Sequence, residues 1–328
     1  MSAKPPRSVL EGKLSWHPAA RAWRTFSGDR AAPARIEVLR EGGKADTFRM
    51  IGLRSGDGPV IAQRSNAEKA RLERFVYERI LPHLPVTAPR YFGALEESSG
   101  FVWLFLEDVG SRRYLESSEA ELALAGRWVG LMHTSAATLP AAAELPDGGP
   151  HRYLEHLRAA RKTIRLHLDN PTFAAEERDA LERLTTELDS VEGEWTGIAC
   201  ACTGLPPTLV HGDFRPKNAY LCEVGGGRLE LFPIDWEMAG WGVPAVDLTR
   251  ISLAGYREAI LPAWPGTSEE DLGRLDGVGR VFRALAGIRW LAPQLANERP
   301  SYLSLPIASL RSLQRSLAAA LAALGAAA

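Results

Sequence analysis

The alternation of apolar and polar residues predicts several short strands in the first third of the chain. From residue 35 apolar side chains alternate with polar ones, pause at a turn containing Gly42 and Gly43, and resume as far as residue 53. This pattern is typical of two strands joined by a glycine turn. Three more stretches have strand character: residues 60–64, 91–95 and 101–106.

Helical periodicity dominates most of the remaining chain. Residues 118–139 are the clearest case, because Leu124 and Trp128 recur on one side and Ser118 with Glu121 has the spacing of a capping box. Helices are also expected over residues 17–26, 68–81, 152–165 and much of 276–315. The chain therefore combines a strand-rich beginning with a helical remainder.

A further hairpin is predicted where two short apolar stretches flank three glycines at residues 225–227. Asp213 and Asn218 come just before its first strand, and Asp235 comes just after its second. A hairpin brings these side chains to one end. Magnesium prefers a few carboxylate or amide oxygens together with water and phosphate oxygens, so Asn218 and Asp235 are candidate magnesium ligands.

Asp213 has a different expected role. It lies five residues before Asn218, across a turn that contains Pro216. It is expected to stay off the metal and to accept a proton from a substrate hydroxyl, because a carboxylate near a cation remains ionised at neutral pH. Each residue alone has a structural alternative, since Asp and Asn often cap turns, and His211 alone is more typical of a core residue. The joint spacing favours the functional interpretation.

This spacing resembles the catalytic and metal-binding loops of the aminoglycoside phosphotransferase and choline kinase group, distant relatives of the eukaryotic protein kinases. The family pattern is His-Gly-Asp, four residues and Asn, followed further on by Ile-Asp-Trp or Ile-Asp-Phe and then by Gly, Pro and Asp-Leu. The residues that match this pattern are His211, Gly212, Asp213, Asn218, Ile234, Asp235, Trp236, Gly242, Pro244, Asp247 and Leu248.

The resemblance implies an α+β, two-lobed protein-kinase-like fold. A small antiparallel-sheet N-lobe would span residues 1–108, and a larger, mainly helical C-lobe would span residues 109–328. The implied activity is transfer of the γ-phosphate of ATP (or GTP) to a hydroxyl of a small molecule, with Mg2+. Asp213 would then be the catalytic base or hydroxyl orienter, and Asn218 with Asp235 would hold the Mg2+ on the phosphates.

Further roles follow from the same resemblance. Asp247 would brace the catalytic loop, and the segment containing Glu107 and Val109 would link the lobes and meet the adenine. Arg215 stands two residues after Asp213, where many protein kinases carry a lysine near the transferred phosphate. We therefore expect Arg215→Ala to lower turnover far more than it lowers ATP affinity.

The glycine turn between the first two predicted strands resembles the nucleotide-covering loop of the family. Glycines let backbone amides approach phosphate oxygens without obstruction by side chains. The candidate residues are Gly42, Gly43 and Lys44. Lys44 either reaches a phosphate or is an ordinary solvated lysine in a turn.

One position departs from the family. Gln63 stands where the family has a lysine that contacts the phosphates and pairs with a helix glutamate, and an amide cannot replace that charge. Arg64 could be the counterpart through a one-residue shift, which would require a bulge because it reverses the face of the strand. Glu73 is the expected helix glutamate, with Glu78 as the second choice, and either could simply face solvent.

Composition narrows the partners. A formal net charge of -1 over 328 residues argues against a general nucleic-acid binder. No stretch reaches the roughly 18 apolar residues of a membrane span. The three cysteines form no paired metal motif, so a reducing compartment is the default. We expect a cytoplasmic protein, a monomer or homodimer, with no nucleic-acid or membrane partner.

The two helical regions expected to wall the acceptor pocket, residues 152–165 and 276–315, are rich in arginine. Like charges oppose binding of a polycationic aminoglycoside. A neutral or anionic hydroxylated metabolite or antibiotic is therefore favoured, with Arg289 and Trp290 as candidate wall residues. The alternative is that most of these arginines form a solvated face.

Two other functions remain open. Because of Gln63, the chain could be a catalytically impaired kinase-fold binding module, although such a module would not need Asp213, Asn218 and Asp235 together. It could also be a kinase that acts on a protein side chain. The Trp-Glu pair after Asp235, in place of Phe-Gly, argues against that second alternative.

Overall fold

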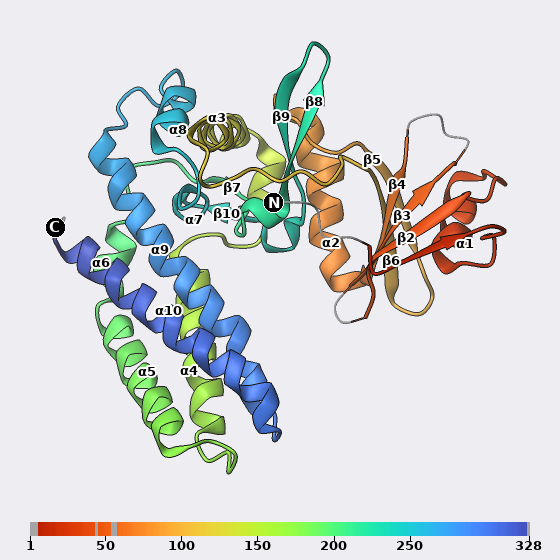
Figure 1. Ribbon diagram of the computed structural model, residues 1–328. Helices are drawn as coiled ribbons and strands as arrows, with labels where there is room; N and C mark the ends of the chain where they lie inside the picture. Colours follow the sequence, from red (N-terminus) through yellow and green to blue (C-terminus); the bar gives the residue numbers. More distant parts are fainter. Residues whose placement is uncertain (1–5, 43–44, 54–57, 327–328) are drawn as a thin grey trace.

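The computed structural model describes residues 6–42, 45–53 and 58–326. These residues form two regions side by side, an antiparallel sheet with two helices and a larger, mainly helical region (Figure 1). The predicted fold class, an α+β two-lobed arrangement of the protein-kinase-like type, is confirmed. The exact division between residues 1–108 and 109–328 stays a prediction.

The N-terminal sheet has six strands in the order β1-β2-β3-β4-β6-β5, and each neighbouring pair is antiparallel. The strand-rich pattern of the sequence therefore corresponds to one continuous sheet. Its strands are β1 (Ser8–Glu11), β2 (Arg35–Arg40), β3 (Ala45–Ile51), β4 (Val60–Asn66), β5 (Tyr91–Glu96) and β6 (Phe101–Glu107).

The two faces of the sheet are covered by different helices. Helix α1 (Pro18–Ser27) covers one face, where Trp103 and Phe105 of β6 are buried in its cluster. On the other face Leu104 packs with Ala70 of helix α2. This division follows from the period of two along a strand, which sends successive side chains to opposite faces.

The register of β4 decides which face each of its residues takes. Gln63 is paired with Leu104, and Arg64 is paired with Trp103. Directly paired residues point to the same face of a sheet. Gln63 therefore faces α2 and the helical region, whereas Arg64 faces the side that α1 covers.

Helix α2 (Ala67–Phe75) begins directly after β4. The side chain of Asn66 accepts a hydrogen bond from the backbone N–H of Lys69 at 2.9 Å and so caps the first turn. The predicted helix over 68–81 is present, but its second half widens into a π-helix (Val76–Ile80) followed by a 3-10 turn (Leu81–His83). The helix thus runs along the boundary between the two regions (Figure 1).

Helices form most of the larger region. Helix α3 packs closely on α8, and a Cβ added to Gly126 of α3 would lie 2.4 Å from the carbonyl oxygen of Ser252. None of the described helices combines the length and apolar character that a membrane span requires. The helices are α3 (Glu119–Ala136), α4 (Pro150–His167), α5 (Ala175–Gly193), α6 (Trp195–Cys200), α7 (Ala245–Leu248), α8 (Leu253–Ile260), α9 (Glu269–Leu291) and α10 (Pro300–Ala326).

Two small two-stranded sheets lie where the regions meet. The hairpin of β8 (Ala219–Val224) and β9 (Arg228–Pro233) is antiparallel, which confirms the hairpin predicted from the glycine turn. The second sheet pairs β7 (Thr208–Val210) with β10 (Gly240–Gly242). The sequence did not reveal this pair, because its strands are short and about thirty residues apart.

One predicted cap is only half formed. The backbone N–H of Glu121 donates to Ser118 Oγ at 3.4 Å, as a capping box requires. The carboxylate of Glu121 instead accepts from the backbone N–H of Leu115 and pairs with Arg112, each at 2.7 Å. The charged partner competes successfully with the cap, because hydrogen bonds to a charged group are the stronger ones.

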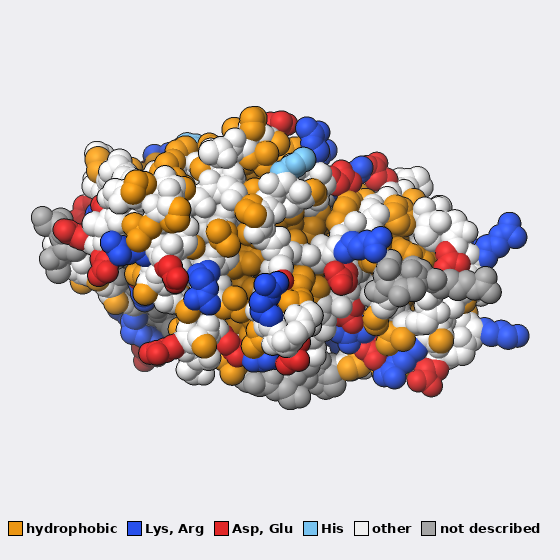
Figure 2. All heavy atoms as spheres, turned by 90° about the horizontal axis from the view of Figure 1, so that it is seen from above, with side chains coloured by type: hydrophobic (Ala, Val, Ile, Leu, Met, Phe, Trp, Pro, Cys, Tyr) orange, Lys and Arg blue, Asp and Glu red, His pale blue; other side chains and the backbone are white. Residues whose placement is uncertain are grey.

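The surface mixes charges of both signs. Seen from above, acidic and basic side chains are interspersed over both regions, without a broad field of one sign (Figure 2). This distribution matches the net charge of -1. A cluster of charged residues also surrounds the loop between β7 and β8, where Asp213 contacts Arg215 and Lys217.

Candidate active site

The loop between β7 and β8 is anchored by its own backbone. Gly212 has φ +78°, and a Cβ at this position would lie 2.2 Å from the carbonyl oxygen of Met238. Only glycine fits such a contact in the left-handed region. His211 is fully buried and its Nε2 lies 3.0 Å from the carbonyl oxygen of Ile234. The histidine therefore fixes the loop, as the structural interpretation expected.

Asp247 anchors the start of this loop through its carboxylate. Its carboxylate accepts the backbone N–H groups of His211 and Gly212 at 2.6 and 3.0 Å, and His133 Nε2 lies 3.3 Å away. Complete burial works against the charged form, yet the hydrogen bond and charge of His133 and the contacts with His211 outweigh it and lower the pKa of Asp247. Asp247 is therefore a buried, ionised residue that holds the loop in place.

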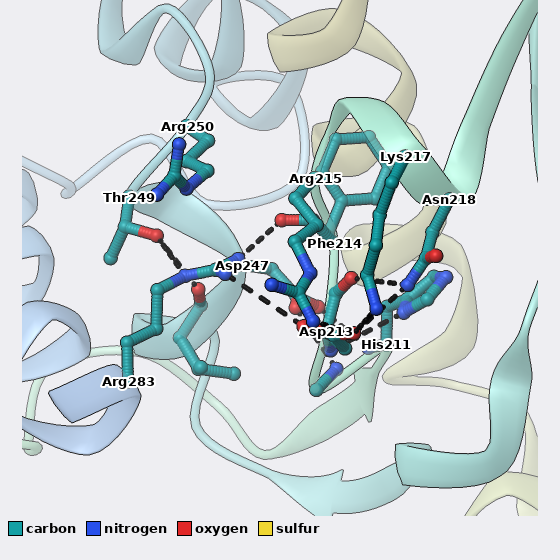
Figure 3. Close-up of polar contacts among 12 residues, drawn as sticks. His211, Asp213, Phe214, Arg215, Lys217, Asn218, Asp247, Thr249, Arg250 and Arg283 are labelled. Atoms are coloured by element: carbon teal, nitrogen blue, oxygen red, sulfur yellow. Dashed lines mark hydrogen bonds and ion pairs between the residues drawn. The ribbon is translucent and has the colours of Figure 1, made fainter. Parts of the chain in front are cut away.

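Asp213 lies at the centre of a group of nitrogen donors (Figure 3). Asn218 Nδ2 and Arg215 Nη2 donate to its Oδ2 at 3.0 and 2.8 Å, and Lys217 Nζ lies 3.2 Å from the same oxygen. Its other oxygen, Oδ1, is 4.0 Å from Arg283 Nη1. One carboxylate oxygen is thus saturated, whereas the other has a single, more distant cation.

Arg283 reaches the loop from helix α9. Its guanidinium donates to the carbonyl oxygen of Phe214 and to Thr249 Oγ1 (Figure 3). Burial lowers the pKa of Arg283, and the charge of Asp213 counteracts this in part. In the sequence, Arg283 is one of several arginines in the basic region 276–315. The sequence feature that could have drawn attention to Arg283 is its position as a single charged residue between the apolar pairs Val281-Phe282 and Ala284-Leu285.

The two candidate metal ligands are adjacent. The backbone N–H of Ile234 donates to the carbonyl oxygen of Asn218 at 2.8 Å, which ties the end of β9 to the start of β8. Asn218 is buried and uses its side-chain N–H group for the backbone and side-chain oxygens of Asp213. Its side-chain carbonyl oxygen remains available for a cation.

Asp235 has the properties of a ligand that awaits a positive charge. It adopts φ +69°, a left-handed conformation that costs of order 1 kcal/mol for a residue other than glycine. Burial raises the pKa of Asp235, and the charge of Glu237 raises it further. No described residue donates a hydrogen bond to its carboxylate. A hard cation bound by Asp235 and Asn218 would compensate this charge, so the pair fits Mg2+.

The described residues contain no cluster of three or more His, Cys, Asp or Glu side chains suited to hold a metal ion. Magnesium commonly takes one or two protein oxygens and completes its shell with water and phosphate oxygens. A site of one carboxylate and one amide oxygen agrees with this preference.

Gln63 and Glu73 are in contact on the face of the sheet that points toward the candidate active site. Gln63 Nε2 donates to Glu73 Oε2 at 2.9 Å. Glu73 is 3% exposed, and burial, followed by the charges of Asp235 and Glu237, raises its pKa to about 8. The pair is therefore an amide and a neutral acid at neutral pH. Glu78, the second choice, pairs with Arg74 instead.

Arg64 does not lie beside Gln63 and Glu73. Its guanidinium lies 2.7 Å from Glu97 Oε2 and 3.9 Å from the centre of the Phe101 ring, on the opposite face of β4. The strand has no bulge here, because Gln63 and Arg64 follow one another in an unbroken register with β6. Arg64 is thus held by Glu97 and Phe101, away from Gln63 and Glu73, and its predicted role in nucleotide binding stays a prediction.

The remaining nucleotide candidates are less informative. Gly42 ends the described part of its turn with φ +79°, and Gly43 and Lys44 lie outside the described residues. Glu107 ends β6 and accepts the backbone N–H of Arg90 at 3.0 Å. The carbonyl oxygen of Val109 accepts a hydrogen bond from the thiol of Cys222. Their nucleotide-binding roles stay predictions.

The basic face of α4 is largely neutralised within the fold. On α4, Arg158 and Arg161 pair with Glu192, and Arg161 and Arg165 pair with Asp189, both acids from α5. These arginines hold two helices together and do not form a free basic wall. For these residues the solvated-face alternative is nearer to the structure than a free basic wall. The difference from that alternative is that acidic side chains of α5 pair with the arginines.

A smaller polar group is left between α4 and α9. Burial lowers the pKa of His156 to about 4, and the charges of Arg152 and Arg289 contribute. His156 Nε2 is buried and has no hydrogen-bond partner among the described residues. Arg152 itself donates to the carbonyl oxygens of Met238 and Ala239. Trp290, the other predicted wall residue, is 43% exposed.

The fold and this site define a class. An antiparallel sheet faces a helical region across a buried loop, and that loop carries one multiply held carboxylate beside an Asn-Asp pair suited to a cation. Protein-kinase-like phosphotransferases have this combination. The chain belongs to the phosphotransferase enzyme family APH, whose sequence model matches residues 35–291.

Solved structures share the fold. The GDP and kanamycin complex of APH(2")-IIia is 17% identical with a TM-score of 0.62, covering 92% of this chain and 99% of that one. Choline kinase from Cryptosporidium parvum is 11% identical with a TM-score of 0.58, covering 87% and 90%. Macrolide 2'-phosphotransferase MphH from Brachybacterium faecium is 17% identical with a TM-score of 0.53, covering 84% and 91%. A search of curated proteins found no match.

Proposed function

We propose that this protein transfers the γ-phosphoryl group of ATP or GTP, with Mg2+, to a hydroxyl of a small neutral or anionic molecule. The observation that carries the proposal is the meeting of Asp213, Asn218 and Asp235 at one end of the β8–β9 hairpin. Membership of the phosphotransferase family supports the reaction type. Structural relatives solved with GDP or with ADP support the use of a nucleotide.

The residues divide the chemistry between them. Asn218 and Asp235 would hold the Mg2+, which neutralises phosphate charge when it is bound. The acceptor's hydroxyl oxygen bonds to the γ-phosphorus, the bond from that phosphorus to the bridging β–γ oxygen breaks, and the nucleoside diphosphate leaves. Asp213 accepts the hydroxyl proton. Transfer of this kind depends mainly on positioning and charge, which the anchored loop supplies.

The contacts of Asp213 indicate which oxygen takes the proton. Oδ2 already faces three nitrogen groups, from Arg215, Lys217 and Asn218, within 3.2 Å. Oδ1 has only Arg283 at 4.0 Å, which leaves room for a hydroxyl. We therefore assign the hydroxyl to Oδ1, on the side of the loop that faces α9.

The charge around Asp213 supports the acceptor class. Arg215, Lys217 and Arg283 place three cations around one carboxylate. A polycationic aminoglycoside would meet like charges here, whereas a neutral or anionic acceptor would not. The structural relative crystallised with kanamycin shows that the fold can bind an aminoglycoside, so the preference proposed here depends on these particular side chains.

The test begins with nucleotide binding. Isothermal titration of the wild-type protein with ATP and with GTP, with and without Mg2+, is compared with Asp235→Asn. Asparagine tolerates the left-handed conformation, so this variant removes the charge without adding strain. Exposed Glu223→Gln on the same hairpin is the control. We expect magnesium-dependent binding in the wild type and the control, and its loss in Asp235→Asn.

Transfer is then measured with radiolabelled ATP against three matched sets of hydroxylated compounds, polycationic, neutral and anionic. Phosphorylation confined to the neutral and anionic sets supports the acceptor class. Preferred phosphorylation of the polycationic set would contradict it, and binding without transfer to any set would favour the alternative below.

A catalytically impaired binding module is the second candidate, and the neutral Gln63–Glu73 pair favours it. An uncharged pair gives a triphosphate no direct positive charge from the sheet. Nucleotide binding that does not depend on Mg2+, or that is absent with ATP and GTP alike, would support this candidate over the enzyme.

A further inference from the structure

We propose that Lys69 is the residue through which the N-terminal region binds the nucleotide phosphates. This inference rests on the proposed function. It begins from the surroundings of Asp235, where Glu237 and Glu73 add acidic groups and Gln63 adds an amide. A nucleotide triphosphate placed at this cluster needs cations from both sides of the site. Of the three cations on α2, Lys69 is the one that pairs with an acid of this cluster, Glu237.

Lys69 lies on the face of α2 that points into the site. It precedes Glu73 by four residues, and residues four apart share one face of a helix. Its Nζ lies 2.5 Å from Glu237 Oε2, and Glu237 comes two residues after Asp235. The charge of Lys69 is also felt at Glu73, where it lowers the pKa against the stronger effect of burial. The ammonium therefore lies against Glu237, two residues along the chain from the candidate metal ligand Asp235.

The present partner of Lys69 is easily exchanged. The Lys69 and Glu237 side chains are 25% and 28% exposed, and partly exposed ion pairs hold their partners weakly. A lysine has a flexible stem and three rotatable donors, so its ammonium can turn from a carboxylate to a phosphate without movement of the helix. The phosphate offers more negative charge than the single carboxylate does.

Other described lysines do not occupy this position. Lys217 lies 3.2 Å from Asp213 in the loop between β7 and β8, Lys13 lies between β1 and α1, and Lys162 belongs to α4 in the helical region. Arg64, the neighbouring cation in sequence, is held on the far face of the sheet by Glu97. Arg49 lies on the same face of the sheet as Gln63 but is tied to Glu37 and Asp108. Among the described residues on the N-terminal side, Lys69 is therefore the cation that the geometry offers to a phosphate.

The experiment compares ATP with adenosine, because only ATP has phosphates. Titration in excess Mg2+ is performed on the wild type, on Lys69→Met and on the control Lys162→Met. We expect Lys69→Met to weaken ATP about 10- to 100-fold and to leave adenosine unchanged. The control should match the wild type for both ligands. Circular dichroism and a melting curve confirm that each variant is folded.

A rescue variant separates a phosphate contact from a structural tie. In the double variant Lys69→Met/Gln63→Lys, a lysine beside Glu73 returns the charge to the same side of the site. ATP affinity should recover most of the loss. A Lys69 that merely holds Glu237 would not be replaced by a lysine at position 63, so failure of the rescue overturns the inference.

Glu237→Gln gives a test with the opposite sign. It removes the carboxylate that Lys69 now contacts, so ATP should bind as tightly as before or more tightly when Mg2+ is absent. Weaker binding, equal to that of Lys69→Met, would identify a structural tie and overturn the inference. ATP binding by wild type and Lys69→Met alike refutes Lys69 and leaves the proposed function standing, whereas no ATP binding by the wild type refutes both.

Discussion

The two sides of the candidate site differ sharply in charge. On the helical side, Asp213 is surrounded by Arg215, Lys217 and Arg283. On the sheet side, Gln63 and Glu73 form a neutral pair at neutral pH. Positive charge is thus concentrated where the acceptor and the transferred group would lie, and the sheet contributes little of it directly. The contrast indicates that a bound triphosphate would receive its positive charge mainly from the helical side and from Mg2+.

The largest expected effect tests the charged side. Asp213→Asn keeps the shape of the side chain but removes the group that accepts the proton, so turnover should fall about 10²- to 10⁴-fold. Nucleotide affinity should not change. Steady-state kinetics together with titration of ATP measure both quantities. An equal loss of affinity would mean that Asp213 binds the nucleotide and not the hydroxyl.

The next effect tests the neutral side through pH. The pKa of Glu73 is raised from its ordinary 4.5 to about 8 by burial. Between these values the unfolded chain loses a proton that the folded protein keeps, so wild-type stability should fall as pH rises and then level off above about 8. In Glu73→Gln that fall should be absent, with a gain of about 2–4 kcal/mol at pH 8 relative to the wild type.

Urea unfolding of the two proteins at pH 5 and pH 8 measures this effect. Glu78→Gln is the control, because Glu78 is a partly exposed acid of the same helical segment, paired with Arg74. Parallel pH curves for wild type and Glu73→Gln would show that Glu73 is ionised in the folded protein, and the contrast between the two sides would then disappear.

A smaller effect is expected at Arg283. In Arg283→Met the carbonyl oxygen of Phe214 and the hydroxyl of Thr249 lose their donor, which should cost about 1–3 kcal/mol of unfolding free energy. Turnover should fall as well, with the acceptor's KM rising more than that of ATP. Arg280→Met on the same helix is the control, since Arg280 pairs with Asp276 at the surface. Equal effects of the two variants would remove Arg283 from the acceptor side.

The smallest effect belongs to Arg64. Its partners, Glu97 and the Phe101 ring, are on the α1 side of the sheet, so Arg64→Ala should cost about 0–1 kcal/mol of stability and leave ATP affinity unchanged. Titration of ATP and a melting curve measure both. A marked loss of ATP affinity would show that Arg64 reaches the nucleotide after all.

Local spacing in the sequence was sufficient for much of the fold and for the centre of the site. The β8–β9 hairpin follows from its glycine turn, and the positions of Asp213, Asn218 and Asp235 follow from the hairpin. The family resemblance implied that position 63 pairs with a helix glutamate, with Glu73 as the first choice, and the structure shows this contact in place of the solvent-facing alternative. These features depend on residues near one another in the chain, which is why they were predictable.

The remaining features depend on distant parts of the chain. Arg283 reaches the carbonyl oxygen of Phe214 from 69 positions away, and no pattern within α9 indicates that contact. The arginines of α4 looked like a free basic wall, because their acidic partners on α5 are known only once the helices pack. A charge whose partner lies on another element cannot be assigned from its own helix.

The β8–β9 hairpin has one more consequence, for those who wish to engineer the protein. Its base carries Asn218 and Asp235, whereas its tip, residues 225–227, is exposed, and the hairpin projects from the top of the molecule (Figure 1). Exposed tips of this kind accept inserted sequences readily. A fluorescent reporter grafted between these glycines would be attached, through two short strands, to the two residues proposed to hold Mg2+. The hairpin tip is therefore a suitable attachment point for a reporter of nucleotide binding.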